Sequence, residues 1–358
     1  MKILITAPSL NTSCNVSGVS TVANTIIEHN KQHRYYHYLL GRPDNEINKL
    51  SWLLQLIKQL FFFPFAVKRE KIELVHQNLP FDPKGLTREY IINCWCRIMR
   101  VPVLLHIHGG IFLMNGTNNP IFRKMAKSLF KHCKQVVVLS ELEKDAINNL
   151  YQFPSTIVLV NSVNTALYKS APKKLSEEKP TLLFLGRIHE SKGVEDIIEA
   201  LRLLKTQMDF RFILCGAGPL KDHFVAACEQ LLSADFEYRG VVSGNAKINI
   251  IKESNIFLLP SRYGEGLPMA LLETMAAGVV PFVTDDASMK YVVQHQVNGI
   301  RVEKRNSRDL YEKLKYILLN KALYESMSGN ASKTILEKYD IKDYIIALNK
   351  IYESLKIF

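Results

Sequence analysis

The stretch IFLLPSRYGEGLPMALLETMAAGVVPFVT, residues 256–284, contains two short apolar runs joined by a glycine-rich loop and a helical segment. Pro268 suits the first turn of that helix, where its missing N–H breaks no hydrogen bond, and Gly278 suits the helix end. This order of strand, loop, helix and strand predicts one unit of a parallel sheet. The loop would bring backbone amides and a helix N-terminus to the carboxyl end of its strand, which suits an anionic ligand.

The same alternation of short apolar runs and helical segments continues on both sides of this stretch. Apolar runs in the first half lie at 2–7, 73–78, 101–109, 135–140 and 156–161, with helical segments near 18–30, 46–70, 85–99, 119–133 and 141–150. Further runs lie at 181–186, 210–216, 236–240, 256–261 and 279–284, and the pattern is helical beyond about residue 305. We therefore predict an α/β protein with two Rossmann-like, doubly wound domains that face each other across a cleft.

The length of the chain also favours two domains, because 358 residues exceed the usual size of a single hydrophobic core. The stretch YKSAPKKLSEEKP, which ends at residue 180, is polar, highly charged and contains two prolines, as is typical of a linker. We expect an N-terminal domain over 1–168, a linker over 169–180 and a C-terminal domain over 181–339. A terminal helix at about 340–358 is expected to pack back on the N-terminal domain.

The net charge of +12 is concentrated in the first half, where residues 1–168 carry 19 Lys and Arg against 10 Asp and Glu. A basic half suits nucleic acid, an anionic membrane surface or a phosphorylated substrate, and it also suits a plain solvated surface. Nucleic acid is disfavoured because the chain contains no recognisable binding module for it. Segments 48–70 and 121–135 mix apolar residues with lysines and arginines, which suits either core packing or a peripheral membrane face.

The six cysteines are scattered, and only Cys94 and Cys96 lie close together. Their spacing fits neither a zinc site nor a thioredoxin-like motif, so the cysteines favour a reducing compartment over a disulfide framework. The N-terminus runs directly into strand-like residues without the features of a signal peptide. No apolar stretch approaches the roughly 20 residues of a membrane-spanning helix. We expect a cytoplasmic protein, or one bound peripherally to the inner face of the cytoplasmic membrane.

Two glutamates stand out in the stretch quoted above. Glu265 lies in the loop, where its carboxylate can accept hydrogen bonds from sugar hydroxyls. Glu273 lies on the second turn of the helix, where it can accept hydrogen bonds from the two vicinal hydroxyls of a ribose. The alternative is a pair of ordinary surface glutamates, which the surrounding glycines, the proline and the strand–loop–helix context disfavour.

This segment resembles the signature of the family 4 retaining glycosyltransferases, E-G-x-P-x-x-x-x-E-x-x-x-x-G. The defined positions are met by Glu265, Gly266, Pro268, Glu273 and Gly278. The resemblance implies the GT-B fold of that family, of the type found in bacterial surface-polysaccharide synthesis. It also implies that Glu265 contacts the transferred sugar and that Glu273 binds the ribose. The backbone amides of Gly266 and Leu267 would then meet the diphosphate.

A second block, LLFLGRIHESKG at 182–193, resembles the family's G-R-x-x-x-x-K-G element. Its Arg187 and Lys192 follow a predicted strand and precede a helix, so these cations can neutralise a diphosphate as it leaves. An isolated Arg and Lys on a loop are more commonly only solvated. The match to the family element implies that both residues bind the donor and assist catalysis.

Two further candidates lie in the first half. In LHIHGG, residues 105–110, His106 and His108 alternate with apolar residues and so share one face of a strand end. A lone histidine at such a place is more often structural. In the family, a histidine before a glycine faces the transferred sugar; His108 matches it better, and holding a sugar hydroxyl is favoured over proton transfer. The family also has a glycine pair near the donor phosphates and the acceptor, where this chain has Ser17 and Gly18.

The same resemblance places the nucleobase of the donor along residues 240–243, with Val242 among the residues that bind the nucleotide sugar. The turn at 216–219 follows a strand but lacks the third glycine of a dinucleotide fingerprint. No two aspartates stand two positions apart, and the adjacent Asp285 and Asp286 form a poor metal site. We therefore expect neither a metal nor a cofactor, with fixed Arg and Lys charges in their place.

Together these resemblances imply a retaining glycosyltransferase that moves a hexose or N-acetylhexosamine from a nucleotide diphosphate sugar, with a UDP-sugar favoured. The acceptor would be a hydroxyl of a glycan or a lipid-linked sugar in cell-surface polysaccharide synthesis. The N-terminal domain would bind this acceptor, and the C-terminal domain would bind the donor. The expected course is front-face displacement, in which the leaving phosphate helps to deprotonate the acceptor.

Two alternatives remain open. One is a non-catalytic, glycosyltransferase-like scaffold or partner subunit, against which the intact Glu265, Arg187 and Lys192 argue. The other is a nicotinamide-dependent oxidoreductase. That enzyme would need a full glycine fingerprint with an acidic residue about 20 positions further on, and the first strand and turn lack it.

Overall fold

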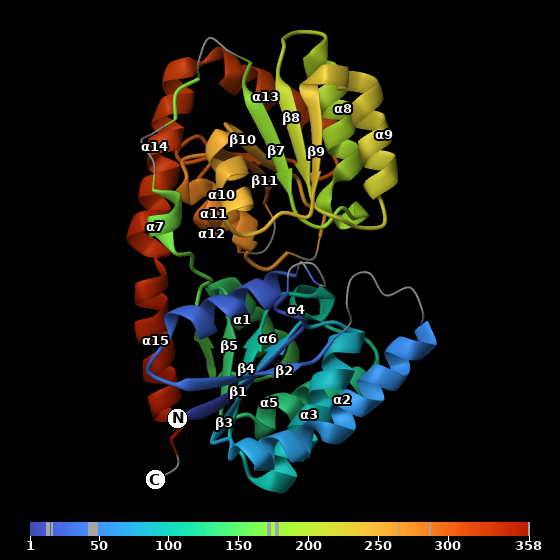
Figure 1. Ribbon diagram of the computed structural model, residues 1–358, viewed down its shortest axis with the longest axis vertical. Helices are drawn as coiled ribbons and strands as arrows, with labels where there is room; N and C mark the ends of the chain where they lie inside the picture. Colours follow the sequence, from blue (N-terminus) through green and yellow to red (C-terminus); the bar gives the residue numbers. More distant parts are fainter. Residues whose placement is uncertain are drawn as a thin grey trace. The chain divides into compact units, whose positions relative to one another are not determined.

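The computed structural model of the protein describes residues 1–11, 15, 17–41, 49–169, 173–175, 179–263, 265–285 and 288–356. The chain forms two compact units (Figure 1). The first comprises Met1–Asn161 together with Lys342–Phe358, and the second comprises Ser162–Ile341. The first unit thus ends before the boundary expected at residue 168, and the whole expected linker, 169–180, falls within the second unit.

The first unit contains six parallel strands in the order β2-β1-β3-β4-β5-β6. The strands are β1 (Lys2–Ala7), β2 (Arg34–Leu39), β3 (Leu74–Leu79), β4 (Val103–Ile107), β5 (Gln135–Val138) and β6 (Thr156–Val158). The helices are α1 (Gly18–His29), α2 (Lys49–Glu70), α3 (Pro83–Met99), α4 (Ile111–Asn115), α5 (Pro120–His132), α6 (Glu141–Tyr151) and α15 (Ile341–Ser354). Helices α2, α3 and α5 lie side by side (Figure 1).

Burial explains which strands of this unit are visible in the sequence. The central strands β3 and β4 are buried along their whole length, because helices cover the faces of a parallel sheet. The edge strand β2 is largely exposed or half-buried, and its residues RYYHYL form no continuous apolar run. The sequence therefore does not predict β2, and the first sheet has one strand more than expected.

The C-terminal helix α15 packs on this first unit. Its Tyr352 is fully buried, and the Tyr352 hydroxyl lies 2.7 Å from His76 Nδ1 on β3. Asn349 Oδ1 accepts a hydrogen bond of 2.6 Å from Asn30 Nδ2 at the end of α1. Because the Tyr352 contact reaches the middle of the sheet, the end of the chain contributes to the core of the N-terminal unit.

The second unit also contains six parallel strands, in the order β12-β11-β10-β7-β8-β9. The strands are β7 (Thr181–Leu185), β8 (Arg211–Cys215), β9 (Phe236–Gly240), β10 (Ile256–Leu259), β11 (Val280–Thr284) and β12 (Ile300–Val302). The helices are α7 (Thr165–Tyr168), η1 (Glu190–Lys192), α8 (Val194–Lys205), α9 (Lys221–Leu232), η2 (Ser233–Asp235), α10 (Gly244–Glu253), α11 (Met269–Ala276), α12 (Met289–Val292), α13 (Ser307–Leu319) and α14 (Lys321–Lys338).

The strand order of the second unit shows where a ligand is expected to bind. The sheet begins with β7; β8 and β9 add on one side, and β10, β11 and β12 add on the other. This reversal places a topological switch point between β7 and β10. In open α/β sheets, ligands bind at such a point, outside the carboxyl ends of the strands. The two loops predicted to bind the donor follow these two strands.

The α/β class and the two Rossmann-like units are confirmed. The short edge strand β12 is not predicted from the sequence, because three residues carry too little pattern. In the described part of the expected linker, Lys173 Nζ donates to the carbonyl oxygens of Ile251 and Ser254, at the end of α10. No helix among the described residues is long and apolar enough to cross a membrane. The cleft between the two domains stays a prediction.

Candidate active site

The carboxylate of Glu265 is held by two side chains that come from different loops. Glu265 follows β10 and is only 8% exposed. Its Oε1 accepts hydrogen bonds from the Ser261 hydroxyl and from the Lys192 ammonium, which also forms an ion pair with it. Because Lys192 lies in the loop after β7, the two loops at the switch point meet at this carboxylate. Ser261 is not singled out by the sequence as a site residue.

The backbones of the two loops also contact each other. The amide of Arg262 donates to the carbonyl oxygen of Ser191 over 2.7 Å. Gly193 has a φ of +72°, and a Cβ at this position would lie 2.2 Å from the carbonyl oxygen of Pro260. Only glycine permits both this conformation and this approach. The family-like K-G pair at 192–193 therefore contains a lysine that meets Glu265 and a glycine that lets the loops meet.

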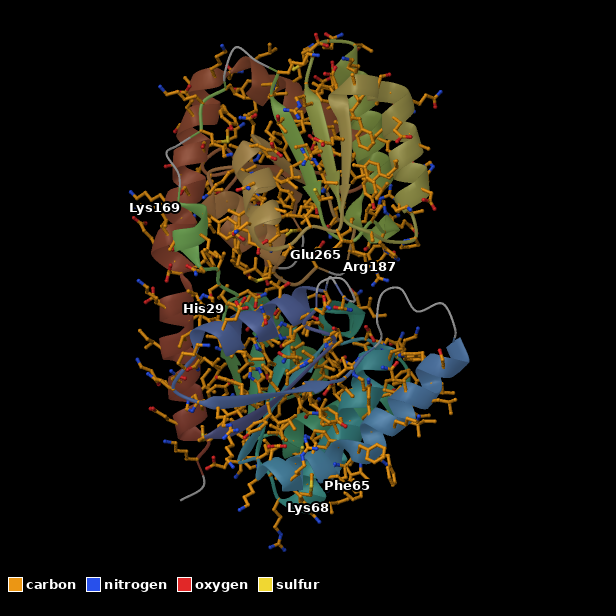
Figure 2. The ribbon with its side chains drawn as sticks, viewed as in Figure 1. His29, Phe65, Lys68, Lys169, Arg187 and Glu265 are labelled. Carbon is orange, nitrogen blue, oxygen red and sulfur yellow. The ribbon has the colours of Figure 1, made fainter. Side chains whose placement is uncertain are left out.

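Arg187 lies at the same strand end but outside this hydrogen-bonded group. It is the second residue after β7, is exposed, and forms no ion pair with any residue that the structure describes. Figure 2 shows Arg187 and Glu265 at the same edge of the second unit. The Lys192 ammonium has three N–H donors, and one of them hydrogen-bonds Glu265, which leaves two for a ligand. Both cations can therefore still meet a diphosphate at this edge.

Glu273 lies on the second turn of α11 and is 5% exposed. Lys247 on α10 forms an ion pair with it, with 2.5 Å between Nζ and Oε1. The Tyr168 hydroxyl on α7 also hydrogen-bonds Glu273; burial raises the pKa of Tyr168, and the negative charge of Glu273 raises it further. The sequence identifies neither partner, because no spacing rule connects α7 and α10 with α11. The one available signal for Lys247 is its place just after the segment assigned to the nucleobase.

The start of α11 differs slightly from the expectation. The helix begins at Met269, and Pro268 is the residue immediately before it instead of the first residue inside it. No side chain among the described residues caps this end. Gly266 and Leu267 lead directly into the helix, and Leu267 is buried. The amides predicted to meet a diphosphate thus lie beside a helix N-terminus, where partial positive charge favours an anion.

The predicted nucleobase segment lies further along the same sheet. Val242 is half-buried in the loop between β9 and α10. That loop follows the edge strand β9, which β8 separates from β7. Val242 therefore lies beyond the carboxyl end of a strand, as Arg187 and Glu265 do, but its strand β9 is two strands away from β7 at the switch point. Its connection with the site runs through α10, which carries Lys247.

In the first unit, His108 directly follows β4 and is held by Asn78 on β3. His108 Nε2 lies 2.7 Å from Asn78 Oδ1, and Asn78 Nδ2 donates to the carbonyl oxygen of Thr6 over 2.8 Å. Burial lowers the pKa of His108 to about 3, so its imidazole is neutral at physiological pH. The rings of His106 and His108 lie 4.1 Å apart, which agrees with the prediction that they share one face. His106 itself is fully buried.

Gly18, the other candidate of the first unit, is the first residue of α1. Ser17, which occupies the place of a family glycine, caps this helix by accepting a hydrogen bond of 3.2 Å from the Ser20 amide. A Cβ added at Gly18 would meet no described atom within 4 Å. The packing of the first unit therefore does not by itself require a glycine at position 18.

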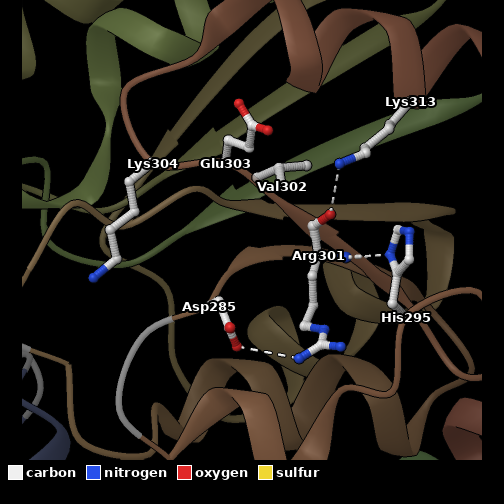
Figure 3. Close-up of a pocket in the computed structure, with 7 residues that line it drawn as sticks. All are labelled: Asp285, His295, Arg301, Val302, Glu303, Lys304 and Lys313. Atoms are coloured by element: carbon white, nitrogen blue, oxygen red, sulfur yellow. Dashed lines mark hydrogen bonds and ion pairs between the residues drawn. The ribbon is translucent and has the colours of Figure 1, made fainter.

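The described residues offer no metal centre, and a hollow in the second unit lies apart from the predicted site residues. The described residues contain no group of three His, Cys, Asp or Glu side chains arranged for a metal, and Asp286 lies outside them. A hollow of about 450 Å³ lies beside β12 (Figure 3), lined by Asp285, His295, Arg301, Val302, Glu303, Lys304 and Lys313. Two of its charged residues, Arg301 and Asp285, pair with each other over 3.2 Å. None of the predicted site residues lines it.

Comparison with known proteins gives a family match that covers most of the second unit and matches to individual proteins that cover more of the chain. Residues 168–334 match the family model of glycosyl transferases group 1. An uncharacterized glycosyltransferase of Methanocaldococcus jannaschii is 25% identical over 263 residues, which are 68% of this chain and 66% of that protein. The N,N'-diacetylbacillosaminyl-diphospho-undecaprenol alpha-1,3-N-acetylgalactosaminyltransferase of Campylobacter jejuni is 25% identical over 319 residues, 84% of this chain and 82% of that protein.

The similarity of fold extends over both units. A crystal structure of HepE from Anabaena, in complex with UDP and glucose, has a TM-score of 0.77 at 16% identity. The match covers 99% of this chain and 100% of that chain. The two doubly wound units therefore have the GT-B fold. The second unit is thus similar to the glycosyl transferases of group 1, whose family model matches residues 168–334.

Proposed function

We propose that this chain is a retaining glycosyltransferase of the family 4 type that uses a nucleotide diphosphate sugar, with a UDP-sugar as the favoured donor. It transfers a hexose or N-acetylhexosamine to a hydroxyl of a glycan or of a lipid-linked sugar, in the synthesis of a cell-surface polysaccharide. The observation that carries the proposal is the buried Glu265, which Lys192 and Ser261 orient at the switch point.

The charges at this edge suit a nucleotide diphosphate. Arg187 is exposed, and Lys192 lies beside the loop that leads into α11. Both cations and the helix start favour a diphosphate, whose negative charge grows as the bond to the sugar breaks. Glu273 then binds the ribose hydroxyls, and residues 240–243 run past the base. Because these charges are fixed, we propose that transfer needs no metal ion or cofactor.

The relatives support this choice of donor and acceptor. The Campylobacter jejuni relative is named as an N-acetylgalactosaminyltransferase that acts on a diphospho-undecaprenol-linked sugar. HepE of Anabaena has been crystallised with UDP and glucose. A sugar carried on a lipid diphosphate would also fit the basic first unit, through which we propose contact with an anionic membrane on the cytoplasmic side.

The proposed reaction is a front-face displacement. The acceptor oxygen forms a bond to the anomeric carbon on the face from which the diphosphate leaves, and the bond from that carbon to the phosphate oxygen breaks. The acceptor proton passes to the departing phosphate oxygen. Glu265 and the neutral imidazole of His108 accept hydrogen bonds from sugar hydroxyls and so orient the sugar, and Gly18 leaves room for the donor phosphates. No described carboxylate is assigned as a covalent nucleophile.

A donor panel tests this proposal. The purified full chain is incubated with UDP-, GDP- and dTDP-sugars in the presence of EDTA, and release of free nucleotide diphosphate is measured. We expect hydrolysis of a UDP-sugar, and Glu265→Gln should lower its rate at least about a hundredfold. The control Glu199→Gln removes an exposed carboxylate of α8 and should retain the full rate. The anomeric configuration of the product, measured by NMR, tests retention.

The two alternative functions give different results in the same assay. A scaffold subunit would release no nucleotide from any donor, and a nicotinamide-dependent oxidoreductase would bind NADH instead of UDP. If no nucleotide sugar binds or is hydrolysed, or if Glu265→Gln leaves the rate unchanged, the enzyme proposal is wrong.

A further inference from the structure

Helix α2 has two apolar faces, and only one of them packs on the protein. Leu60, Phe63 and Val67 face the core of the first unit, where they pack with residues such as Val75 of β3. On the other side, six large apolar side chains are 46% to 59% exposed: Leu53, Leu54, Ile57, Phe61, Phe62 and Phe65. We call these six side chains the outer face of α2. A helix that is apolar on all sides is normally covered on all sides.

The aromatic part of the outer face forms one continuous cluster. The ring centroids of Phe61, Phe62 and Phe65 lie between 5.4 and 6.1 Å from one another. Single exposed apolar residues are common on soluble proteins, but contiguous exposed patches mark binding surfaces. The outer face therefore requires a partner that takes up apolar side chains.

Positive charge accompanies these apolar side chains. Lys58, Lys68 and Arg69 are exposed on α2, and Lys68 lies near Phe65 in Figure 2. Glu70, the only acidic residue of the helix, is its last residue and pairs with Arg69 over 2.7 Å. Helix α3, which packs on α2, and helix α5, which packs on α3, add further exposed cations, including Arg97. A partner for this surface should have an apolar interior that takes up these side chains and a negatively charged surface that attracts the cations.

From this combination we propose that the outer face of α2 docks on an anionic lipid bilayer, with the helix lying in the plane of the membrane surface. The phenylalanine, leucine and isoleucine side chains enter the boundary between headgroups and acyl chains. Lysine and arginine side chains reach from there to the lipid phosphates. Docking uses no residue of the candidate active site, but its purpose, access to a lipid-linked acceptor, rests on the proposed function.

A second copy of the chain fits this surface less well than lipid does. In a symmetric dimer the same patch meets itself. Lys58 and Lys68 of the two copies would then be brought together, with Glu70 as the only acidic residue that α2 supplies. An anionic bilayer instead attracts every one of these cations.

Vesicle binding of the full chain tests this proposal. Vesicles of equal parts phosphatidylglycerol and phosphatidylcholine are compared with vesicles of phosphatidylcholine alone, by co-sedimentation at low and high salt. We expect binding to the anionic vesicles that weakens with salt. The variant Phe61→Ser/Phe62→Ser/Phe65→Ser should lower the partition coefficient at least about tenfold. The control Tyr316→Ser/Leu319→Ser alters equally exposed apolar residues of α13 in the second unit and should bind as the unchanged chain does.

Three outcomes would overturn the docking proposal. It fails if the unchanged chain stays in the supernatant, or if the triple variant binds vesicles equally well with an unchanged unfolding temperature. It also fails if the chain forms a dimer that the triple variant abolishes while no vesicle binding is seen. Donor hydrolysis without lipid is measured on the same samples, and the triple variant should retain it. If the unchanged chain binds vesicles but hydrolyses no donor, that result would count against the proposed function alone.

A second inference comes from the hydrogen bonds of Asn78, which is 1% exposed. Its Nδ2 donates to the carbonyl oxygen of Thr6, an atom that can only accept. This contact fixes the orientation of the side-chain amide, so the oxygen Oδ1 faces His108 Nε2 at 2.7 Å. An amide oxygen can only accept, so the proton of the neutral imidazole must lie on Nε2.

We infer that Asn78 is a positioning residue that holds His108 in the Nε2–H tautomer and keeps its Nδ1 as a hydrogen-bond acceptor. An acceptor at this atom is what a sugar hydroxyl needs, so the inference deepens the role proposed for His108 and rests on it. The other polar ring neighbours, His106 and His76, are buried and neutral, because burial holds the pKa of each well below its usual value. They therefore add no charge beside His108.

Nitrogen NMR of the imidazoles and a double-mutant cycle test this inference. In the unchanged chain, His108 should stay in the Nε2–H form from about pH 6 to about pH 8. Asn78→Ala should mix the tautomers, and Asn78→Asp should give a charged imidazole over part of this range. Asn78→Ala should raise KM for the donor several-fold, but should have no further effect in a His108→Gln background.

A proton on Nδ1 in the unchanged chain overturns the second inference, as does a full Asn78→Ala effect in the His108→Gln background. If His108→Gln leaves transfer unchanged while the tautomer is as expected, the sugar-binding role proposed for His108 fails and the tautomer assignment stands.

Discussion

Arg262 and Asp196 form a bidentate ion pair, with guanidinium nitrogens 2.9 and 3.2 Å from the two carboxylate oxygens. Arg262 lies in the loop that carries Glu265, and Asp196 lies in the first turn of α8, just after Lys192. Their side chains are only 16% and 10% exposed. The pair therefore joins the two segments whose side chains meet at the candidate active site.

Arg262→Ala should lower both stability and transfer. The change leaves the largely buried Asp196 without its main partner, which should reduce the free energy of unfolding by about 2 kcal/mol. It also frees the loop of Glu265, so kcat should fall more than the KM for the donor rises. Denaturant unfolding and steady-state kinetics measure the two effects. The control Arg202→Ala breaks an exposed pair with Glu199 and should change neither quantity; equal effects of both variants would contradict the joining role.

Gly193→Ala should destabilise the second unit strongly. The new Cβ would lie 2.2 Å from the carbonyl oxygen of Pro260, at a φ of +72°. The left-handed conformation alone costs an ordinary residue about 1 kcal/mol, and the clash with backbone adds to it. The matched control is Gly186→Ala, because a Cβ at Gly186 meets nothing within 4 Å. Thermal unfolding should separate the two variants by several degrees, and similar unfolding temperatures would show that the loops tolerate a shift.

Glu273→Gln should weaken binding of UDP by at least about tenfold, because hydrogen bonds to a charged acceptor contribute about 1.5 to 3 kcal/mol. Transfer at saturating donor should fall much less, since Glu273 is proposed to bind the ribose and not the reacting sugar. Calorimetric titration with UDP measures the affinity, and Glu229→Gln on the exposed side of α9 serves as control. An unchanged Kd would mean that the carboxylate serves only its contacts with Lys247 and Tyr168.

Stability of the first unit should fall as the pH is lowered from 7 towards 4. Burial lowers the pKa of His76 and of His108 to about 3, and that of His106 well below its usual value. Between these values and the unfolded pKa of about 6.5, the unfolded chain binds protons that the folded chain does not. Each histidine then costs about 1.4 kcal/mol for each pH unit. The full stability is present above pH 6.5.

Thermal unfolding at several pH values measures this dependence, and His106→Gln should flatten it between about pH 4 and about pH 6.5. The control Leu319→Ala alters an exposed, non-titrating residue of α13 and should leave the slope unchanged. A slope that both variants leave equally steep would assign the acid lability to other groups.

The sequence by itself determined the class of fold and the main catalytic candidates. Most buried strands of the two sheets are apolar runs, although the buried β3 contains His76, Gln77 and Asn78. The glycine loops that follow β7 and β10 are local features of the chain. Arg187, Lys192 and Glu265 lie in these loops, so motif spacing was enough to find them. The edge strands β2 and β12 were not found, because β2 is largely exposed or half-buried without a continuous apolar run and β12 has only three residues.

Tertiary structure alone decided which side chains meet. Lys247, Arg262 and Asp196 reach partners that lie far away in the chain, and no sequence period encodes such contacts. Ser261 is only four residues from Glu265, but the course of their loop decides that contact. The tertiary structure likewise decided which side of α2 faces the core of the first unit. A helix that is apolar on nearly every side carries no periodic signal of direction. Only the packing of Phe63 and Val67 on the sheet shows that Phe61, Phe62 and Phe65 lie outside.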